Sequence, residues 1–310
     1  MFFKILIKIC NNCKQLYFFQ YDVNNLENMN KIFTEYSINN IIHFASFKSV
    51  SESIKEPLLY YKNNINSTLN ILELCSKYNV KNLIFSSSAT VYGSENSPLV
   101  ENSKTGIGIT NPYGQSKYII EKILEDMCKS NIFTNIIILR YFNPVGAHLS
   151  GLIGENPNGI PNNLMPFILN VAIKNNINKN ISDVYSQLKI YGNKYNTIDG
   201  TCIRDYIHVV DLANAHIKSI EYLNKNNNIK YDVFNIGTGK GTTVMEMLNA
   251  FCKINNVNIP YKICANRDGD IDSVFCDTTK TEKLLEWKSN KTLNDICRDA
   301  YNYILTSKND

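Results

Sequence analysis

The sequence lacks a glycine before Asp22, a hydrophobic run long enough to cross a bilayer, and a dense run of basic residues. Without glycines the backbone cannot approach a pyrophosphate at a helix N-terminus, which excludes a dinucleotide-binding turn before Asp22. The apolar segment Met1 to Cys10 is interrupted by Lys4 and Lys8 and precedes no small-residue cleavage site, so it is neither a membrane span nor a secretion signal. We expect it to be the edge of a helix or strand.

Charge and cysteine content exclude several classes of function. A net charge of +4 is small for 310 residues, and the basic residues form no stripe with interleaved aromatics, so we expect neither a nucleic-acid nor a membrane partner. Nine cysteines, an odd number in a chain of this length, suit reduced thiols and a cytoplasmic location. Cys10 and Cys13 form a lone CxxC with no second pair, and we interpret it as incidental, with no metal bound.

Short apolar runs alternate with helical periodicity through the first half of the chain. Because each helix connects successive strands, this order predicts an α/β fold with a Rossmann-like, doubly wound parallel sheet whose ligands gather at the carboxyl ends of the strands. The expected strands are Leu16 to Tyr21, Ile41 to Phe44, Asn82 to Ser86 and Ile136 to Arg140. The expected helices are Asn25 to Tyr36, Pro57 to Tyr78 and Pro112 to Ser130.

Beyond Val145 the chain becomes rich in Gly, Pro and Asn, which predicts a smaller lobe of shorter elements. We therefore divide the chain into a cofactor domain, residues 1–150, and a substrate lobe, residues 151–310. The Asn/Lys-rich segment Lys174 to Ser186 is expected to be a mobile surface loop. Gly237 to Thr242 follows a strand but has the wrong spacing for a phosphate loop, so we interpret it as a strand-to-helix turn. The other expected elements are helices Leu164 to Ala172, Val209 to Leu223, Thr243 to Cys252 and Leu293 to Leu305, with a strand Asp232 to Ile236.

The chemistry is concentrated in Ser88, Tyr113 and Lys117. Ser88 ends the serine run that follows the predicted strand Asn82 to Ser86. Tyr113 and Lys117 stand four positions apart at the start of a predicted helix, so both point to the same side. A phenol is a poor base at neutral pH, but a cation beside it favours the phenolate and lowers its pKa. These residues are predicted to transfer protons.

Longer blocks around these residues resemble the extended short-chain dehydrogenase/reductase superfamily and, within it, the UDP-glucose 4-epimerase family. The similarity extends from about Asp22 to the C-terminus. The matching blocks are His43-Phe44-Ala45, Phe85 to Gly93, Asn111 to Lys117, Tyr141 to Gly146, Gly159 to Pro166 and Arg204 to His208.

The resemblance implies a homodimeric enzyme of galactose metabolism that inverts C4 of a UDP-hexose through a 4-keto sugar and uses bound NAD. Tyr113 would take the proton of the 4-hydroxyl, Ser88 would position that proton, and Lys117 would bind the nicotinamide ribose and lower the pKa of Tyr113. The helices Pro57 to Tyr78 and Pro112 to Ser130 would form the dimer interface.

The resemblance also assigns the ligand contacts residue by residue. Besides Tyr113 and Lys117, the cofactor contacts would be Asp22 and Val23 at the adenine, with Phe44, Lys48, Asn63 and Phe142. Besides Ser88 and Tyr113, the substrate contacts would be the amides of Asn143 and Asn163, Arg204 and Arg267 at the diphosphate, Tyr191 stacked on uracil, and Asp270 at the ribose. Core packing is an alternative role for Phe44 and Phe142.

Two departures from the family pattern affect these expectations. Val274 stands where relatives carry Tyr or Cys, and its small side chain predicts activity on UDP-N-acetylhexosamines as well. The family opens with a strand, a GxxGxxG turn, a helix and a second strand, so the chain as written is expected to lack about one βαβ unit, on the order of thirty-five residues. We therefore expect the sheet to be split beside Ile41 to Phe44, with weak NAD binding and poor folding.

Three hypotheses follow. The chain is an epimerase recorded without its start, a non-catalytic relative that keeps a nucleotide-sugar pocket, or another enzyme of this scaffold such as a nucleotide-sugar 4,6-dehydratase. The dehydratases resemble this chain but place an acid pair after the strand-end hydroxyl, where Ala89 and Thr90 stand here. The intact Ser88, Tyr113 and Lys117 favour the first hypothesis.

Overall fold

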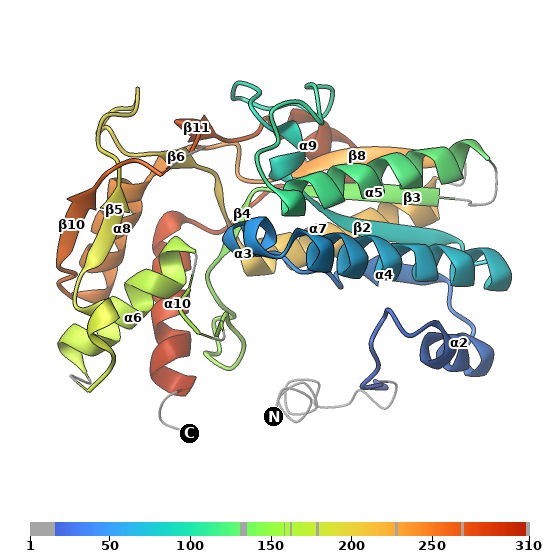
Figure 1. Ribbon diagram of the computed structural model, residues 1–310, viewed down its shortest axis with the longest axis horizontal. Helices are drawn as coiled ribbons and strands as arrows, with labels where there is room; N and C mark the ends of the chain where they lie inside the picture. Colours follow the sequence, from blue (N-terminus) through green and yellow to red (C-terminus); the bar gives the residue numbers. More distant parts are fainter. Residues whose placement is uncertain are drawn as a thin grey trace.

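A four-stranded parallel sheet lies at the centre of the larger of the two bodies of the molecule (Figure 1). The computed structural model describes residues 16–130, 135–157, 159–161, 163–177, 180–226, 229–267 and 270–307. The strands lie in the order β1-β2-β3-β8, and their bounds are Asn40–His43, Asn82–Ser88, Asn135–Tyr141 and Tyr231–Ile236. The predicted α/β class and parallel sheet are confirmed.

Helices cover both faces of this sheet, because successive side chains of each strand point to opposite sides. Leu83 and Phe85 of β2 pack with α4 (Pro57–Tyr78) and α5 (Pro112–Lys129), beside which α2 (Leu26–Glu35) lies. Ile84 packs on the other side with α7 (Val209–Lys225) and α9 (Thr279–Leu285). The sheet therefore contributes to two separate hydrophobic clusters.

The strand expected at Leu16 to Tyr21 is absent, and this prediction was wrong. These residues form no ladder with any described strand, and Leu16, Tyr17 and Phe18 are 40–60% exposed. β1 is consequently an edge strand among the described residues, paired only with β2, and β8 is the other edge. Without a neighbour on the far side of β1, aromatic content alone does not hold a segment in a sheet.

The second lobe is built around its own core, from α6 (Leu164–Asn176), α8 (Val244–Asn255) and α10 (Leu293–Ser307). A parallel pair of strands, β5 (Leu188–Tyr191) and β10 (Tyr261–Cys264), packs beside them (Figure 1). The chain returns to the main sheet after residue 150, since β8, α7 and α9 all pack there. The part of the chain after residue 150 therefore contributes elements to both the main sheet and the second lobe, so the two bodies are not separated at one residue.

Short pairings join the two bodies near the carboxyl edge of the main sheet. β4 (Asn143–Val145) pairs with β7 (Tyr206–His208), and β6 (Ile203–Arg204) lies between β11 (Ser273–Val274) and β9 (Thr242–Thr243). Short helical turns complete the described chain: α3 (Val50–Lys55), η1 (Ala89–Tyr92) and η2 (Asp183–Tyr185). The sequence did not predict α3, which follows a capping Ser49 within a segment expected to be a loop.

The segment Lys174 to Ser186 is more ordered than expected. α6 continues to Asn176, and η2 forms after it. The Lys174 ammonium contacts the carbonyl of Ile181 and lies 2.9 Å from a carboxylate oxygen of Asp183, while Tyr185 is buried. These contacts tie the described part of the segment to the second lobe. The expectation of a loop was wrong for the end of α6 and for η2, but most of the described side chains are exposed, as expected of a surface segment.

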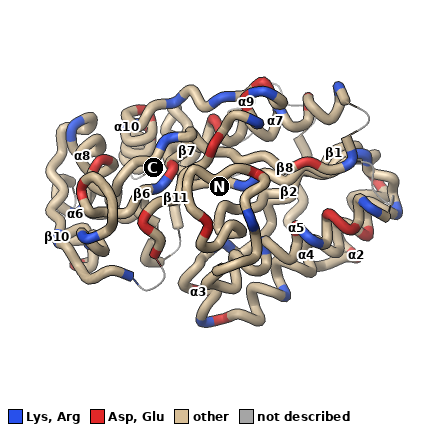
Figure 2. Tube along the Cα trace, turned by 90° about the horizontal axis from the view of Figure 1, so that it is seen from above, with Lys and Arg blue, Asp and Glu red and all other residues tan. Residues whose placement is uncertain are grey.

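Basic and acidic residues are interspersed along the chain, as the view from above shows (Figure 2). Among the described residues, no helix combines the length and apolar character needed to span a membrane. Cys10 and Cys13, and the segment Met1 to Cys10, lie outside the described residues.

Candidate active site

Ser88 and Tyr113 meet at the carboxyl end of β2. Ser88 is the last residue of β2, and its hydroxyl accepts a hydrogen bond from the Thr90 amide at 3.3 Å. Tyr113 lies in the first turn of α5, which begins at Pro112 and is capped by Asn111, whose side chain accepts from the Gly114 amide at 2.9 Å. A Cβ on Gly114 would lie 3.1 Å from Thr90, so glycine there lets α5 approach η1 closely.

The phenol of Tyr113 is protonated when the chain is by itself. Burial raises the pKa of Tyr113, and a hydrogen bond from Ser88 acts in the opposite direction by favouring the phenolate. Ser88, and not Lys117, opposes this rise in the chain alone, so the expectation that Lys117 lowers the pKa of Tyr113 together with the positive charge of the cofactor stays a prediction. The Lys117 ammonium lies 6.0 Å from the centre of the Tyr113 ring.

Lys117 is a cation held inside the protein. Its side chain is only 2% exposed, and its ammonium donates to the carbonyl of Ser86 at 2.7 Å and lies 4.8 Å from the centre of the Phe85 ring. Burial lowers the pKa of Lys117 to about 7, although the Glu121 carboxylate acts against the shift. Near neutral pH this lysine is thus poised between charged and neutral forms.

A buried ion pair stands behind the lysine. The carboxylate of Glu121, one turn further along α5, accepts from the Ser87 hydroxyl at 2.5 Å and from the Arg140 guanidinium at 2.7 Å and 3.0 Å. Both side chains of the pair are about 95% buried. These bonds connect α5 to β2 and β3 and fix the helix that carries Tyr113 and Lys117.

Sequence reasoning missed His216 and the side chain of Tyr141, which meet beside the predicted site. His216 Nδ1 lies 2.8 Å from the carbonyl of Leu212, which can only accept, so Nδ1 carries the proton and Nε2 accepts from the Tyr141 hydroxyl at 2.5 Å. Burial lowers the pKa of His216 and keeps the ring neutral. The ring centre lies 4.9 Å from that of Phe44, so the pair supports a predicted cofactor contact. Nothing in the sequence marked His216, which sits mid-helix 75 residues from Tyr141.

The residues predicted at the adenine end of a cofactor converge on Asn24. Its backbone and side-chain nitrogens donate to Asp22 Oδ1, at 2.8 Å and 3.2 Å, and its side chain also donates to Asn63 at 3.1 Å. Val23 is held by the Asn70 side chain, which donates to its carbonyl at 3.0 Å. Asn24 Oδ1 is buried and has no hydrogen-bond partner among the described residues. An unsatisfied acceptor beside a carboxylate fits the amino group of an adenine.

Phe44 and Lys48, also predicted cofactor contacts, lie on the loop that follows β1. The Phe44 ring is 57% exposed and the Lys48 ammonium lies 3.1 Å from Glu155. Asn64, which sequence reasoning missed, holds this loop: it accepts from the Phe47 amide at 2.8 Å and donates to the Phe47 carbonyl at 3.1 Å. An aromatic face on an anchored loop suits a planar ligand.

Replacement of Asn64 by alanine is expected to destabilise the protein by about 1 to 3 kcal/mol, because both backbone groups of Phe47 lose their partner in a partly buried place. Urea unfolding measures the change. Asn66, two residues further on the same helix, is exposed and serves as the control, whose alanine variant should stay within about 0.5 kcal/mol of the parent. Equal effects of the two substitutions would show that the loop is not held by Asn64.

Tyr191 and Arg267, predicted at uracil and diphosphate, lie against each other. Tyr191 ends β5, and the guanidinium carbon of Arg267 lies 4.0 Å from the centre of its ring. The register of the parallel pair places Tyr191 beside Cys264, three residues before Arg267. The structure therefore brings these two predicted substrate residues together.

Arg204 and Asp270 form a second pair in this region. The Arg204 guanidinium donates to the carbonyls of Ile203 and Ile271, at 2.8 Å each, and lies 3.5 Å from the Asp270 carboxylate. Its side chain is 19% exposed, which makes it a firmly held cation at a partly open surface. Such a guanidinium can offer its remaining N–H groups to an anion.

Val274, Phe142 and Asn143, also predicted to contact a ligand, lie in surroundings that differ from one another. Val274 pairs with Arg204 and packs in a cluster with Phe142 and Ala89, the residue that follows Ser88, so it lies near the proton-transfer residues. Phe142 is 6% exposed in this cluster, which confirms its packing role. Asn143 is exposed in β4.

Asn163 caps α6 without a side-chain cap bond and donates instead to Glu155 at 3.4 Å. Glu155 also accepts from Lys48, so one carboxylate joins a predicted substrate residue to a predicted cofactor residue. Glu155 thus contacts one residue from each of the two predicted ligand sites.

The glycine-rich turn Gly237 to Thr242 is filled by the protein itself. The Asp205 carboxylate accepts from the amides of Thr238 and Gly239 at 2.8 Å and 3.0 Å, and from the Thr238 hydroxyl at 2.7 Å. A Cβ on Gly237 would lie 2.6 Å from this carboxylate. An internal anion occupies the amides that a phosphate would need, which agrees with the interpretation as a structural turn.

Comparisons with known proteins agree with this site. Residues 8–237 match the NAD dependent epimerase/dehydratase family. A UDP-glucose 4-epimerase from Caenorhabditis elegans is 48% identical over 276 residues, which cover 89% of this chain and 76% of that protein. Two solved UDP-glucose 4-epimerases are also similar. The one from Bifidobacterium longum, in complex with NAD+ and UDP, has a TM-score of 0.89 at 41% identity, covering 99% of this chain and 87% of that one.

The other, from Stenotrophomonas maltophila, holds NAD and formylated UDP-arabinopyranose and has a TM-score of 0.91 at 37% identity, with the same coverage of 99% and 87%. Sequence and fold thus point to one group of enzymes, and the structure brings the side chains of Ser88, Tyr113 and Lys117 near one another. The chain belongs to the NAD dependent epimerase/dehydratase family and, within it, to the UDP-glucose 4-epimerases.

Proposed function

We propose that Ser88, Tyr113 and Lys117 carry out the proton transfers of a reversible C4 epimerisation that interconverts UDP-glucose and UDP-galactose in galactose metabolism. The observation that carries the proposal is the meeting of the Ser88 and Tyr113 side chains above a buried lysine, at the carboxyl edge of the sheet. Bound NAD would supply the hydride chemistry at C4, as acceptor in the oxidation and as donor in the reduction.

The chain's own residues manage the proton in this scheme. Tyr113 takes the proton of the 4-hydroxyl as the carbonyl forms and gives it back when the carbonyl is reduced, and Ser88 holds the reacting oxygen. The buried ammonium of Lys117 stabilises the phenolate, and the Glu121 carboxylate opposes loss of its charge. Asp22, Val23, Phe44, Lys48, Asn63 and Phe142 would line the cofactor site.

Substrate binding is assigned to the second lobe and the segments that join it to the sheet. Arg204 and Arg267 neutralise the diphosphate, Tyr191 stacks on uracil and Asp270 accepts from the ribose hydroxyls. Asn143 and Asn163 donate their amides to the sugar and the diphosphate. The partial exposure of Arg204 and Asp270 supports this assignment, because the pair can be reached by a ligand.

The direct test is an assay of the purified chain with UDP-galactose and saturating NAD, coupled to detection of UDP-glucose. Saturating cofactor is needed because the described residues include no glycine-rich turn before β1 for its pyrophosphate. We expect turnover that depends on added NAD. Binding of UDP without any turnover would instead assign the chain to a nucleotide-sugar-binding role.

Val274 is proposed to admit N-acetylated sugars. Its side chain lies in the cluster that contains Ala89 and Phe142, so a larger residue there would crowd the sugar beside Ser88. We expect Val274→Tyr to lower kcat/KM for UDP-N-acetylglucosamine by at least about tenfold while UDP-glucose is affected by less than about threefold. Parent protein that turns over UDP-glucose but not UDP-N-acetylglucosamine would contradict the proposal.

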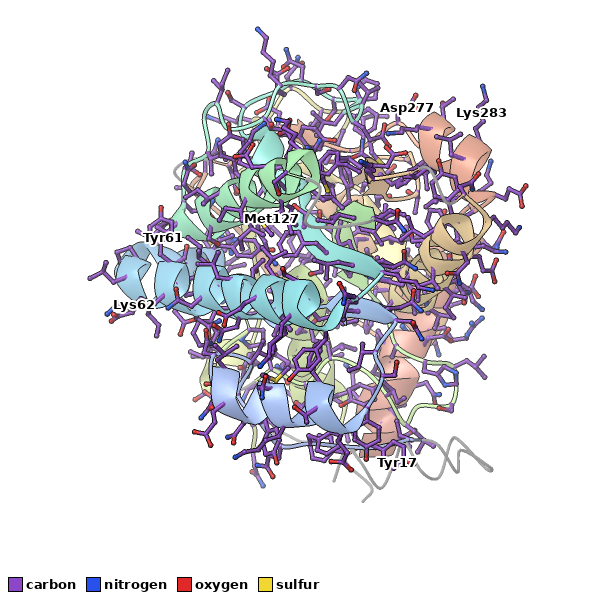
Figure 3. The ribbon with its side chains drawn as sticks, turned by 90° about the vertical axis from the view of Figure 1, so that its right-hand side faces the viewer. Tyr17, Tyr61, Lys62, Met127, Asp277 and Lys283 are labelled. Atoms are coloured by element: carbon purple, nitrogen blue, oxygen red, sulfur yellow. The ribbon has the colours of Figure 1, made fainter. Side chains whose placement is uncertain are left out.

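A homodimer formed through α4 and α5, in the cytoplasm, completes the proposal. The two helices lie side by side and carry Tyr61, Lys62 and Met127 among their side chains (Figure 3). On α4, Leu58 and Leu69 are 71% and 44% exposed, which is unusual for apolar side chains on a helix surface. The free thiols of the seven described cysteines support a reducing compartment. Light scattering after size exclusion should give twice the chain mass, and Leu69→Glu should lower it.

A further inference from the structure

The contact between Arg267 and Tyr191 conflicts with the roles proposed for these two residues. The guanidinium carbon lies 4.0 Å from the ring centre, which places the cation directly over the aromatic face. A uracil base stacked on the same face would need the same space. The structure therefore places the proposed diphosphate-binding residue, Arg267, over the ring proposed to bind the base.

Arg204 behaves differently although it is assigned to the same diphosphate. Its guanidinium is fixed by two backbone carbonyls at 2.8 Å and by Asp270 at 3.5 Å, and only 19% of its side chain is exposed. Arg267 is exposed, and within the described part of the chain the contact of its guanidinium is the Tyr191 ring. One arginine is a fixed cation, whereas the other can exchange one partner for another.

We propose that Arg267 covers the Tyr191 ring until a phosphate draws it away, so that uracil stacks there only when the ligand carries phosphate. The inference rests on the proposed function and deepens it, because it names the residue that selects uridine diphosphates over uridine. A phosphate offers the guanidinium paired oxygens and opposite charge, which is a stronger contact than an exposed aromatic face. Uridine has no phosphate, so it must displace the guanidinium from the Tyr191 ring without offering it a new contact.

This exchange predicts effects of opposite sign on two related ligands. Arg267→Gln removes the competing cation, so it should raise the affinity for uridine about two- to fivefold, the size of an exposed cation–π contact. The same substitution removes a phosphate contact, so it should lower the affinity for UDP about tenfold or more. Selectivity for UDP over uridine falls on both counts.

Calorimetric titration of the purified chain with uridine and with UDP, in the same buffer, measures both affinities without requiring turnover. Arg204→Gln is the matched control, because it also removes a proposed phosphate contact but no cation over Tyr191. It should weaken UDP binding without tightening uridine binding. Thermal unfolding of each variant shows whether the fold is retained.

The outcomes separate this inference from the proposed function. Tighter uridine binding by Arg267→Gln, with weaker UDP binding, supports the exchange. Uridine affinity that is unchanged or lowered in Arg267→Gln overturns it and indicates that uracil stacks elsewhere or together with the guanidinium, while UDP binding by the parent still supports the proposed function. A parent chain that binds no UDP overturns both.

Discussion

Tyr113→Phe is expected to lower kcat for UDP-galactose by about 10² to 10⁴-fold, the usual contribution of a positioned general acid or base. The substitution removes a single oxygen, and the phenyl ring keeps its place in the first turn of α5. Because Tyr113 takes the proton of the 4-hydroxyl, its loss should act on the chemical step. Affinity for UDP, which depends on residues of the second lobe, should change by less than about threefold.

A tyrosine on the same helix provides the control for this experiment. Tyr118 is partly buried, packs beside Gly106 and has the Lys122 ammonium 5.8 Å from its ring centre. Tyr118→Phe should therefore retain turnover within a few-fold of the parent. If Tyr113→Phe kept more than about a tenth of the parent turnover, or lost UDP binding, Tyr113 would not be the proton acceptor.

Lys117→Met should stabilise the protein while it abolishes activity. The ammonium is 2% exposed, and burial lowers its pKa from 10.5 to about 7, which means that the folded state resists the charge. Each unit of pKa change corresponds to about 1.4 kcal/mol, so an apolar side chain of similar length should raise the free energy of unfolding at pH 6 by roughly 2 to 4 kcal/mol. Turnover should fall at least about a hundredfold, because the phenolate of Tyr113 loses its cation.

The stability gained by Lys117→Met should decrease as the pH rises. The unfolded chain holds the Lys117 proton up to about pH 10.5, whereas the folded chain holds it only up to about pH 7. Between these values the unfolded state binds more protons, so stability of the parent rises with pH. The buried Lys117 ammonium lowers the free energy of unfolding by its full amount below about pH 7 and has no such effect above about pH 10.5. The stability advantage of the methionine variant should shrink over the same pH range.

Urea unfolding of parent and variant at pH 6 and pH 10, without added cofactor, measures this difference. Lys122→Met, five residues further on α5 with half of its side chain exposed, should change stability by less than about 0.5 kcal/mol at both pH values. A Lys117→Met variant less stable than the parent at pH 6 would show that the contacts with Ser86 and Phe85 outweigh the desolvation of the ammonium.

Local patterns in the sequence predicted most of the regular structure. The helix expected at Pro57 to Tyr78 has those bounds, since proline at its start and asparagine after its end limit it locally. The helix that begins at Pro112 was predicted for the same reason. The strand that begins at Asn82 was predicted to end at Ser86, whereas it continues to Ser88. The strand expected at Leu16 to Tyr21 failed because a strand needs a neighbour, which no local pattern supplies.

For the candidate site too, local patterns in the sequence determined some features and the tertiary structure determined the others. By itself the sequence determined the parallel α/β sheet and the identities of Ser88, Tyr113 and Lys117, because strand and helix periodicity and an i, i+4 spacing are local properties. Only the tertiary structure decided the burial that raises the pKa of Tyr113 and lowers that of Lys117, the Tyr141 to His216 hydrogen bond, and the stacking of Arg267 on Tyr191. Desolvation and long-range contacts depend on which distant segments surround a side chain, and that is set by packing rather than by neighbours in the chain.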